Sequence, residues 1–499
     1  MRKTTLSRRE LLWQAMGAAG LAFGQTRTQQ KTSVLFIIVD DLRPELGCYG
    51  NPVVKTPNTD RLARRGVTFT RAYCQQAVCT PSRTSFLTGM RPDTTKVYDN
   101  GRGEFRKILP DVITLPQFFR QQGYETRGLG KVFGEGLNDP RAWSVPLWPE
   151  GIAGMQYVDL EKWSRVPAAE KSRTPVPTLE WEKRESWQAP EVPDNALQDG
   201  QVAERALQAL REMRGKPFFL AVGFLKPHLP FVAPKKYFDL YSLREIPDPP
   251  YPFPPKGAPE VALHPWVELR GYKDIPKAGP LPPGKARELV RGYYAATSYT
   301  DAQVGKVLDE LDRLELASRT VVVLLGDNGW HLGEHDLWVK TTNFEFDTRV
   351  PLIFSGAGVP AQGVKSPGLV EFVDLYPTLC GLCGFTPPRE LEGLSMAPLL
   401  AEPARKWKKA AFSQFPRPFS PKSAGDGMGY SVRTERYRYT EWRMPGQPQN
   451  AIELYDHEKD PFETVNVAGR PENRPLLAQL QKTLQDGWRA ALPAGIEKR

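Results

Sequence analysis

Short apolar runs recur along the first two thirds of the chain at places where buried strands are expected. Three of them are apolar at almost every position: 33–39, 217–224 and 320–325. Such continuous runs are typical of strands that are buried on both faces of a parallel sheet. Less hydrophobic segments over 67–73 and 124–129 also have strand character, and 320–325 is expected to be the last strongly buried strand.

Amphipathic segments separate these strands. The spacing of apolar residues and the helix caps predict helices over 58–66, 114–122 and 196–213, and a long helix that ends near 316. Strands that alternate with helices predict an α/β fold, in which helices cover both faces of a large, mostly parallel or mixed sheet. Two proline-rich segments, 140–193 and 248–283, interrupt the pattern, and the first is predicted to be a surface insertion that shapes a pocket.

The pattern of apolar residues changes beyond about residue 403. Segments 410–413, 430–434 and 436–442 alternate with period two, which predicts a small antiparallel sheet with one face in water. A helix from about 474 to 491 is expected to close this sheet. We therefore divide the chain into a leader over 1–30, a main α/β domain over 31–405 and a C-terminal α+β subdomain over 406–499.

The leader has the composition of an export signal. Ser7-Arg8-Arg9-Glu10-Leu11-Leu12 is a twin-arginine pattern, followed by a moderately apolar stretch, and the alternative is a disordered basic tail. Removing the leader takes away five basic residues and one acidic residue, so the formal net charge falls from +10 to +6. No run of about 18 apolar residues follows. We expect an exported protein, periplasmic or extracellular, without a transmembrane segment.

Composition argues against two other classes of protein. The basic excess is modest and nowhere concentrated, so it favours an anionic substrate and not nucleic acid. Five cysteines are too few and too scattered for a disulfide scaffold. Cys380 and Cys383 lie in a predicted packed helix without a second pair to complete a zinc site, so we expect core thiols there. A bridge between Cys48 and Cys74 is left open.

Polar residues follow two of the buried strands directly. Asp40 and Asp41 come after the first strand, and Asp327 and Asn328 come after the last. Ligands in open α/β sheets gather at the carboxyl ends of the strands, and hard oxygen ligands suit a calcium ion. Three basic residues and a histidine in other loops offer positive charge and a group that exchanges protons near neutral pH: Arg83, Lys131, Lys340 and His228.

A cysteine-containing stretch, 78–89, links these residues to a chemistry. Pro81 suits the first position of a helix and Gly89 the position just past its end, so Cys79 is expected at a helix N-terminus. Free N–H groups there can cradle a tetrahedral oxyanion. Cys79-Thr80-Pro81-Ser82-Arg83 resembles the sulfatase signature, in which the cysteine is oxidised after translation to Cα-formylglycine. Without the rest of the signature, a lone cysteine there would be an incidental core residue.

The resemblance extends over nearly all of the mature chain. The sequence is similar to type I sulfatases of the alkaline phosphatase superfamily, and specifically to the iduronate-2-sulfatases. The matching segments are 79–99, 130–133, 218–231, 299–305, 329–335, 350–354, 412–418, 428–439 and 453–463. The resemblance implies an alkaline phosphatase-like fold, with 31–405 as the catalytic domain. It also implies a sulfated saccharide as substrate and a formylglycine-generating enzyme as the partner for maturation.

The resemblance also implies a role for each candidate residue. Calcium would be held by an oxygen of the formylglycine derived from Cys79 together with Asp40, Asp41, Asp327 and Asn328. Arg83 would orient the formylglycine hydrate, Lys131 and Lys340 would clamp the sulfate oxygens, and His228 would lie beside the leaving oxygen. One hydroxyl of the hydrate attacks sulfur, the alcohol departs, and the second hydroxyl then expels sulfate.

One position departs from the family pattern. The family usually carries a histidine two or three residues after the lysine, but Lys131-Val132-Phe133 is followed by Gly134. His331 and Glu135 are candidates for the missing base, and the glycine could instead make room for a different sugar. Two other functions remain as alternatives: a phosphoesterase of the same superfamily, which the five histidines disfavour, and a catalytically silent protein that binds sulfated glycans.

Overall fold

The computed structural model describes residues 31–101, 105–134, 137–148, 159, 162, 165–167, 183–420 and 423–496. The predicted leader over 1–30 and the candidate base Glu135 lie outside the described residues. Within the described part of the chain, no helix is long and apolar enough to cross a membrane. Residues 32–499 form one compact unit, and the boundary at 405 stays a prediction.

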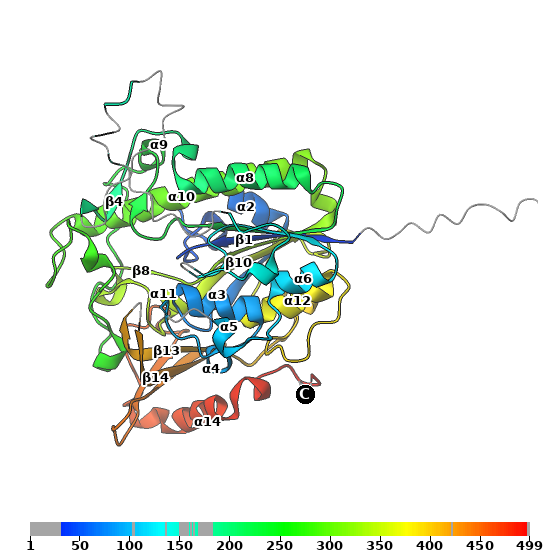
Figure 1. Cartoon of the computed structure of the whole chain (residues 1–499). Helices are drawn as coiled ribbons and strands as arrows, with labels where there is room; N and C mark the ends of the chain where they lie inside the picture. Colours follow the sequence, from blue (N-terminus) through cyan, green and yellow to red (C-terminus); the bar gives the residue numbers. More distant parts are fainter. Residues whose placement is uncertain are drawn as a thin grey trace, which may run out of the picture. The chain divides into compact units, whose positions relative to one another are not determined.

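A mixed sheet of eight strands forms the centre of this unit (Figure 1). Its strand order is β11-β2-β10-β7-β1-β5-β3, and β12 also pairs with β2. The strands are β1 (Ser33–Val39), β2 (Gly66–Tyr73), β3 (Glu125–Gly130), β5 (Phe218–Phe224), β7 (Thr320–Gly326), β10 (Arg349–Gly356), β11 (Val364–Ser366) and β12 (Val370–Glu371). Strands β3, β5, β1 and β7 are parallel, whereas β10 runs antiparallel to β7 and β2. The predicted α/β fold with a sheet between helices is confirmed.

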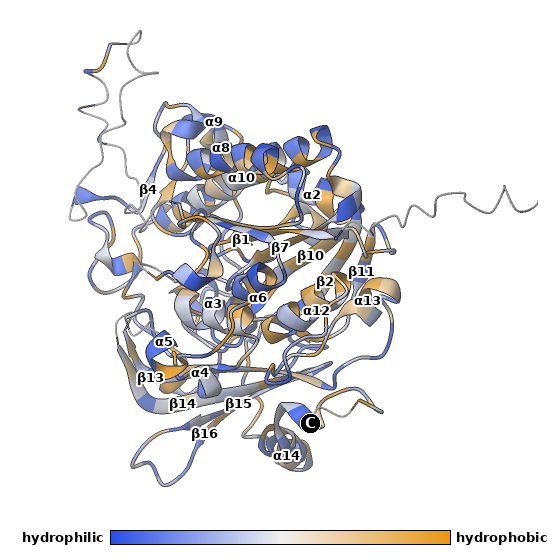
Figure 2. Cartoon of the chain, turned by 45° about the vertical axis from the view of Figure 1, so that its right-hand side comes forward, coloured by the Kyte–Doolittle hydropathy of each residue, from blue (hydrophilic) through white to orange (hydrophobic). Residues whose placement is uncertain are grey.

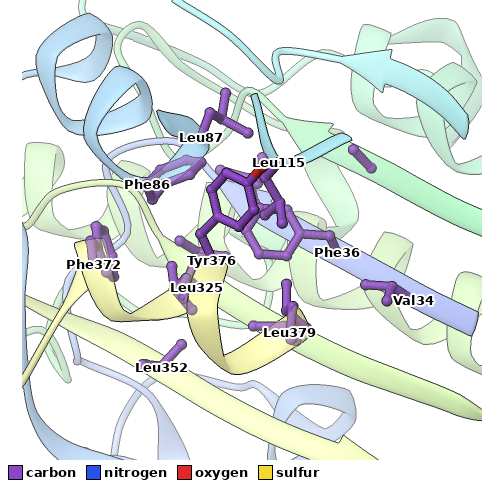
Figure 3. Packing of buried hydrophobic residues seen from close by; sticks show 14 of the residues in the cluster. Val34, Phe36, Phe86, Leu87, Leu115, Leu325, Leu352, Phe372, Tyr376 and Leu379 are labelled. Atoms are coloured by element: carbon purple, nitrogen blue, oxygen red, sulfur yellow. The ribbon is translucent and has the colours of Figure 1, made fainter. Parts of the chain in front are cut away.

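Helices cover both faces of the sheet (Figure 1). One face carries α2 (Pro57–Arg64), α8 (Gln198–Glu212) and α10 (Lys285–Arg313), and the other carries α3 (Cys79–Thr88), α6 (Leu115–Gln121) and α12 (Leu375–Leu382). Alternate residues of β1 supply the two cores: Phe36 packs towards α3 and α6, and Ile37 packs towards α8 and α10. Figure 3 shows Phe36 among Phe86, Leu115 and Tyr376. Burial of each such large apolar side chain stabilises the folded state by about 1.5–3 kcal/mol. The packed sheet therefore holds the loops at its edge in place.

A second sheet of four antiparallel strands completes the fold. It consists of β13 (Ala410–Ser420), β14 (Ser423–Thr434), β15 (Tyr437–Arg443) and β16 (Ala451–Asp456), in that order. Helix α14 (Arg474–Ala490) packs on it through Leu480, which lies in one core cluster with Val432 and Leu454. In Figure 2 the strands around β10 and β2 are largely orange, whereas blue gathers on helices such as α8. The predicted C-terminal α+β unit is therefore confirmed.

Several boundaries differ from the prediction. Strand 320–325 is not the last strongly buried strand, because β10 follows it and pairs with it. Helix α3 begins at Cys79, so Pro81 is its third residue and not its first. Gly89 ends the helix in a left-handed conformation, as expected. All five cysteines are free, and Cys380 is buried in the main core.

Glu453 in β16 predicts a pH dependence of stability. Its carboxylate accepts hydrogen bonds from Trp442 Nε1 at 2.8 Å and Tyr455 Oη at 2.7 Å. Burial raises the pKa of Glu453 from 4.5 to about 7, so the folded state binds this proton more tightly than the unfolded state. Stability must therefore fall as the pH rises from 4.5 to 7, by up to about 3 kcal/mol from this group. The Glu453→Gln variant should lack this part of the decline in urea unfolding midpoints at pH 5 and pH 7. Equal pH dependence of the two proteins would contradict the prediction.

Candidate active site

The predicted site residues meet at one edge of the large sheet. Asp40 and Asp41 follow β1, and Asp327 and Asn328 follow β7, where Val39 pairs with Gly326. Backbone bonds tie these strand ends together, since Asp40 N donates to Phe224 O and Asp327 N donates to Val39 O, each at 3.1 Å. Four other elements bring the remaining predicted residues to this edge: Cys79 and Arg83 from α3, Lys131 from the end of β3, His228 from the loop after β5 and Lys340 from the residue after β9 (Trp338–Val339).

Three carboxylates form the centre of the site. Oxygens of Asp40, Asp41 and Asp327 lie within 4.8 Å of one another, and all three residues are fully buried. Asp40 accepts from Lys131 Nζ at 2.5 Å and from Arg83 Nη2 at 2.9 Å. Burial alone would raise the pKa of Asp40, but Lys131 and Arg83 hold it well below its usual range. Asp40 is therefore an anion with two fixed cationic partners.

Asp41 has a strained backbone conformation and lies beside Asp40 and Asp327. Its φ is +57°, a value that is uncommon for a residue other than glycine, and its N–H donates to Asp327 Oδ1 at 2.9 Å. Lys340 Nζ donates to both carboxylate oxygens of Asp41, at 2.8 and 2.6 Å. Burial and the neighbouring carboxylates of Asp40 and Asp327 nevertheless raise the pKa of Asp41 well above its ordinary value. The three buried carboxylates thus disfavour one another's negative charge, and Lys340 offsets this only in part at Asp41.

Asn328 lies beside the carboxylates, and its hydrogen bonds bear on whether the cluster can hold a cation. Its Nδ2 donates to Asp41 Oδ1 at 2.8 Å and to Gly329 O at 2.9 Å. Its Oδ1 is buried and has no hydrogen-bond partner among the described residues. A buried acceptor without a donor, beside three crowded carboxylates, is the donor set of a hard divalent cation such as calcium. The residues present therefore fit the metal.

Cys79 is the first residue of α3 and lies against this cluster. Its Sγ is 3.9 Å from Asp41 Oδ1 and within 4.8 Å of ligand atoms of Asp40 and His228. Burial raises the pKa of the Cys79 thiol well above its ordinary value, and the charge of Asp40 raises it further. The unmodified side chain is therefore a neutral thiol at neutral pH and a poor nucleophile.

His228 is buried beside the cluster. Its Nδ1 is 2.7 Å from Leu229 O, and because a carbonyl only accepts, Nδ1 carries the hydrogen. Its Nε2 is 3.5 Å from Asp41 Oδ2 and 3.3 Å from Glu268 Oε1. Burial and the positive charge of Lys340 lower the pKa of His228 well below its ordinary value. The imidazole is accordingly neutral, with Nε2 turned towards the site.

Glu268 is a site residue that sequence reasoning missed. It comes from the proline-rich segment 248–283, where no periodicity marks it, and it lies 3.6 Å from Lys340 Nζ as well as beside His228. It also lines a cavity of about 300 Å³. The other lining residues are Leu263, His264, Pro265, Val267, Val339, Thr341, Arg417, Pro418 and Phe419. Val339 and Thr341 flank Lys340 with φ of +75° and +94°, so strained backbone presents this lysine to the site.

Of the two proposed substitutes for the family histidine, Glu135 lies outside the described residues, and His331 does not supply a free base. Both ring nitrogens of His331 are engaged, by Asp347 Oδ1 at 2.6 Å and by His335 Nδ1 at 3.3 Å. Gly134 does not open space either. A Cβ at position 134 would lie 2.0 Å from Thr80 Oγ1 and 2.9 Å from Leu137 Cδ1, so the threonine already fills that volume. The volume beside Gly134 is therefore not open for a different sugar, and that explanation of the glycine is wrong.

The contact between Thr80 and Gly134 predicts a strong coupling between the two positions. The Gly134→Ala variant should lose about 1–3 kcal/mol of stability, because the new methyl group collides with Thr80. The Thr80→Ala variant should be nearly neutral, since Thr80 Oγ1 is buried without a partner among the described residues. The double variant should recover part of the loss, because the collision with Thr80 Oγ1 disappears while the Cβ of residue 80 and Leu137 Cδ1 remain 2.9 Å from the new methyl group. Urea unfolding of the four proteins measures this cycle.

A matched control for this cycle is Gly381→Ala in α12. A Cβ there meets only Ser395 Oγ, at 3.7 Å, which is an ordinary contact. This variant should keep the stability of the parent protein. Additive effects of the substitutions at 80 and 134 would show that the two side chains do not compete for the same volume.

Known proteins resemble this chain over most of its length. The family model "Sulfatase" matches residues 32–385, and the model "N-sulphoglucosamine sulphohydrolase, C-terminal" matches residues 333–489. Iduronate 2-sulfatase of Homo sapiens is 37% identical over 545 residues, covering 92% of this chain and 96% of that protein.

Solved structures also align with most of this chain. A protein in complex with D-glucosamine-2-N,6-O-disulfate aligns with a TM-score of 0.72 at 21% identity, covering 92% of this chain and 99% of that one. A "2-O GAG sulfatase" aligns with a TM-score of 0.66 at 25% identity, covering 92% of each chain.

Proposed function

The chain belongs to the sulfatase family and is a sulfuric ester hydrolase, and we propose that it removes sulfate from a sulfated saccharide with residue 79 as formylglycine. The observation that carries the proposal is the position of Cys79, at the start of α3 and against Asp41, Asp40 and His228. A protonated, buried thiol is a poor nucleophile there. Formylglycine would supply a hydrated aldehyde, whose hydroxyl is the nucleophile that the thiol is not.

Calcium is the proposed metal of the site. Asp40, Asp41, Asp327 and Asn328 would hold it, because they combine three crowded carboxylates with a buried amide oxygen that lacks a donor among the described residues. The ion would supply positive charge beside the sulfate and the nucleophile. The sequence predicts the same four residues, and their proximity in the structure supports the proposed ligand set.

The basic residues divide into two groups by their contacts. Arg83 donates to Asp40 and Asp327, at 2.9 and 2.7 Å, and to the Lys131 carbonyl, so we assign it to positioning the carboxylates and the β3 loop. Lys131 and Lys340 each have an ammonium group beside the carboxylate cluster. Carboxylates raise the pKa of both lysines, which therefore stay charged and can neutralise the oxygens of a bound sulfate.

His228 is proposed to act at the leaving oxygen of the ester. Its neutral ring holds Nδ1–H on Leu229 O and turns Nε2 towards Asp41 and Glu268. This arrangement fixes the ring orientation and leaves Nε2 without a hydrogen. Nε2 would therefore accept the proton of the attacking hydroxyl group and then pass it to the departing alcohol oxygen. Glu268 can accept a hydrogen bond from a sugar hydroxyl beside it.

The cavity next to Lys340 is the proposed place for the sugar. Its lining is mainly apolar, with Glu268 towards the sulfate site and Arg417 as its cationic residue. Arg417 is buried and donates to the carbonyls of Val261, Ala262, Pro416 and Thr341. No carboxylate among the described residues forms an ion pair with it, and burial lowers the pKa of Arg417 to about 10. A substrate carboxylate would supply the missing negative charge.

We therefore favour a sulfated uronic acid, as the name of the human iduronate 2-sulfatase suggests for that relative. We further propose that the leader directs export to the periplasm or the exterior. A formylglycine-generating enzyme would modify Cys79 before folding.

The first test is mass spectrometry of the peptide from Ala72 to Arg83 in protein from its native host. A loss of about 18 Da relative to cysteine would identify formylglycine, because the thiol becomes an aldehyde. Sulfate release from a panel of sulfated saccharides, with and without a carboxylate, should be measured on the same sample. Faster turnover of phosphate esters would favour a phosphoesterase, and saccharide binding without turnover would favour a silent glycan-binding protein.

A further inference from the structure

A second cavity, of about 300 Å³, lies beside the C-terminal sheet and contains none of the proposed catalytic residues. Residues from β13, β14, α14 and α4 (Pro92–Thr95) line it, and Figure 1 shows these elements around the small sheet. Aromatic and hydrogen-bonding side chains share the lining. We call this pocket the β13–α14 cavity. Its charged, amide and aromatic lining residues include Arg91, Asp93, Glu392, Phe412, Gln414, Tyr430, Arg443 and Trp488.

Arg91 lines this cavity with a buried side chain, one nitrogen of which has no hydrogen-bond acceptor among the described residues. The residue is 8% exposed, and its Nη1 and Nη2 donate to Glu371 at 2.8 and 3.0 Å. Its guanidinium lies over the rings of Phe412, at 5.7 Å, and Trp488, at 5.3 Å. Its Nε is buried and has no acceptor among the described residues. A buried donor without an acceptor is costly in a folded protein unless a ligand or water supplies one.

A break in α14 brings Trp488 to the cavity. Gly487 has φ of +73° and ψ of −175°, a backbone conformation that only glycine adopts readily. A Cβ at Gly487 would have no neighbour within 4 Å, so the backbone and not the space requires glycine. The helix therefore loses regular geometry directly before the tryptophan whose ring lies beside Arg91.

The polar groups of the cavity are held in place by one another. Asp93 Oδ1 accepts from Gln414 Nε2 at 2.9 Å and from Tyr98 Oη at 3.0 Å. Glu392 accepts from Arg91 N at 2.6 Å and from Thr94 Oγ1 at 2.8 Å. The cavity therefore presents fixed acceptors and donors next to aromatic rings, and its charges have both signs. Arginines already lie over these rings: Arg91 and Arg489 over Trp488, and Arg443 over Tyr430.

We propose that the β13–α14 cavity is a second carbohydrate site, which binds one unit of a saccharide chain apart from the reaction at residue 79. A sugar ring has apolar C–H faces that pack on aromatic side chains and hydroxyl groups that both donate and accept. The cavity offers both kinds of contact, and its volume is at the lower end of the range for small-ligand sites, about 300–1,000 Å³. The balance of charges favours hydroxyl recognition, so the site should accept saccharides with and without sulfate.

The test uses the full chain with Cys79→Ala, which prevents turnover, and a desulfated glycosaminoglycan tetrasaccharide as the probe. Calorimetry and tryptophan fluorescence measure its binding. Trp488→Ala in the same background should weaken the affinity about tenfold or more, as expected for an aromatic anchor. Trp148→Ala is the matched control, since Trp148 also has an arginine, Arg205, over its ring but lies outside the cavity. This control should bind like the parent protein.

A second variant and a second readout separate binding from folding. Arg443→Ala should also weaken binding, and because the Arg443 side chain is 45% exposed and lines the cavity over Tyr430, its loss should leave the fold intact. With Cys79 present, Trp488→Ala should raise KM for a polymeric substrate and leave kcat/KM for a sulfated monosaccharide within about twofold. Equal affinity of the parent, Trp488→Ala and Arg443→Ala proteins would overturn the proposal, as would no detectable binding to the parent. Because the probe carries no sulfate, failure of the sulfatase mechanism would leave this result unchanged.

Discussion

Replacement of Cys79 by alanine should abolish sulfate release, with a loss of at least about 10⁴-fold in kcat. The methyl group leaves no atom at position 79 that attacks sulfur, while the proposed calcium ligands and the lysines remain in place. Cys79 is 1% exposed and packs at the start of α3, so removal of one sulfur atom should cost little stability. Release of sulfate from the substrate that wild-type protein turns over best is the measurement.

Cys74→Ala is the matched control for Cys79→Ala. Cys74 is also fully buried, burial raises the pKa of its thiol as well, and its Sγ contacts Asp347 O at 3.7 Å. If the function of Cys79 were only to fill space, the two variants would behave alike. We expect the Cys74 variant to retain activity within a fewfold, and turnover by Cys79→Ala within tenfold of wild type would refute the proposed nucleophile.

The carboxylate cluster was predictable from the sequence because its residues follow strands that are buried on both faces. The runs that end at Val39 and Leu325 are apolar at almost every position, and parallel strands bring their carboxyl ends to one edge. That rule places Asp40 beside Asp327 without knowledge of any contact. The direction of β10 was not predictable in this way, because a buried antiparallel strand carries the same apolar pattern as a parallel one.

Other features of the site depend on contacts that no local pattern records. Glu268 reaches His228 and Lys340 from an irregular proline-rich segment, so neither period nor motif marks it. The role of Gly134 depends on Thr80, a residue 54 positions earlier whose side chain takes the volume that a Cβ would need. The sequence shows that the family histidine is missing near Gly134. The contact with Thr80, which only the structure shows, explains why a side chain does not fit there.

Replacement of Arg83 by methionine should destabilise the protein by about 3–5 kcal/mol, because it removes a cation that two buried carboxylates share. Arg83 is fully buried and donates to Asp40 Oδ1 at 2.9 Å and Asp327 Oδ2 at 2.7 Å. Methionine fills a similar volume but supplies no charge. Calcium should restore part of the loss, since the ion provides positive charge to the same two carboxylates. Urea unfolding of wild-type and variant proteins with a chelator and with calcium measures both effects.

Arg91→Met is the control for Arg83→Met, because it also removes a buried arginine but leaves the proposed metal site unchanged. Arg91 also forms a buried ion pair, with Glu371, but none of its contacts is a proposed calcium ligand. Its replacement should therefore destabilise the protein to a similar degree, while calcium stabilises it no more than it stabilises wild type. A larger calcium effect in Arg83→Met than in Arg91→Met places the ion at Asp40 and Asp327. Equal calcium effects in the two variants would mean that Arg83 and the ion do not act on the same carboxylates, and the proposed ligand set would have to be abandoned.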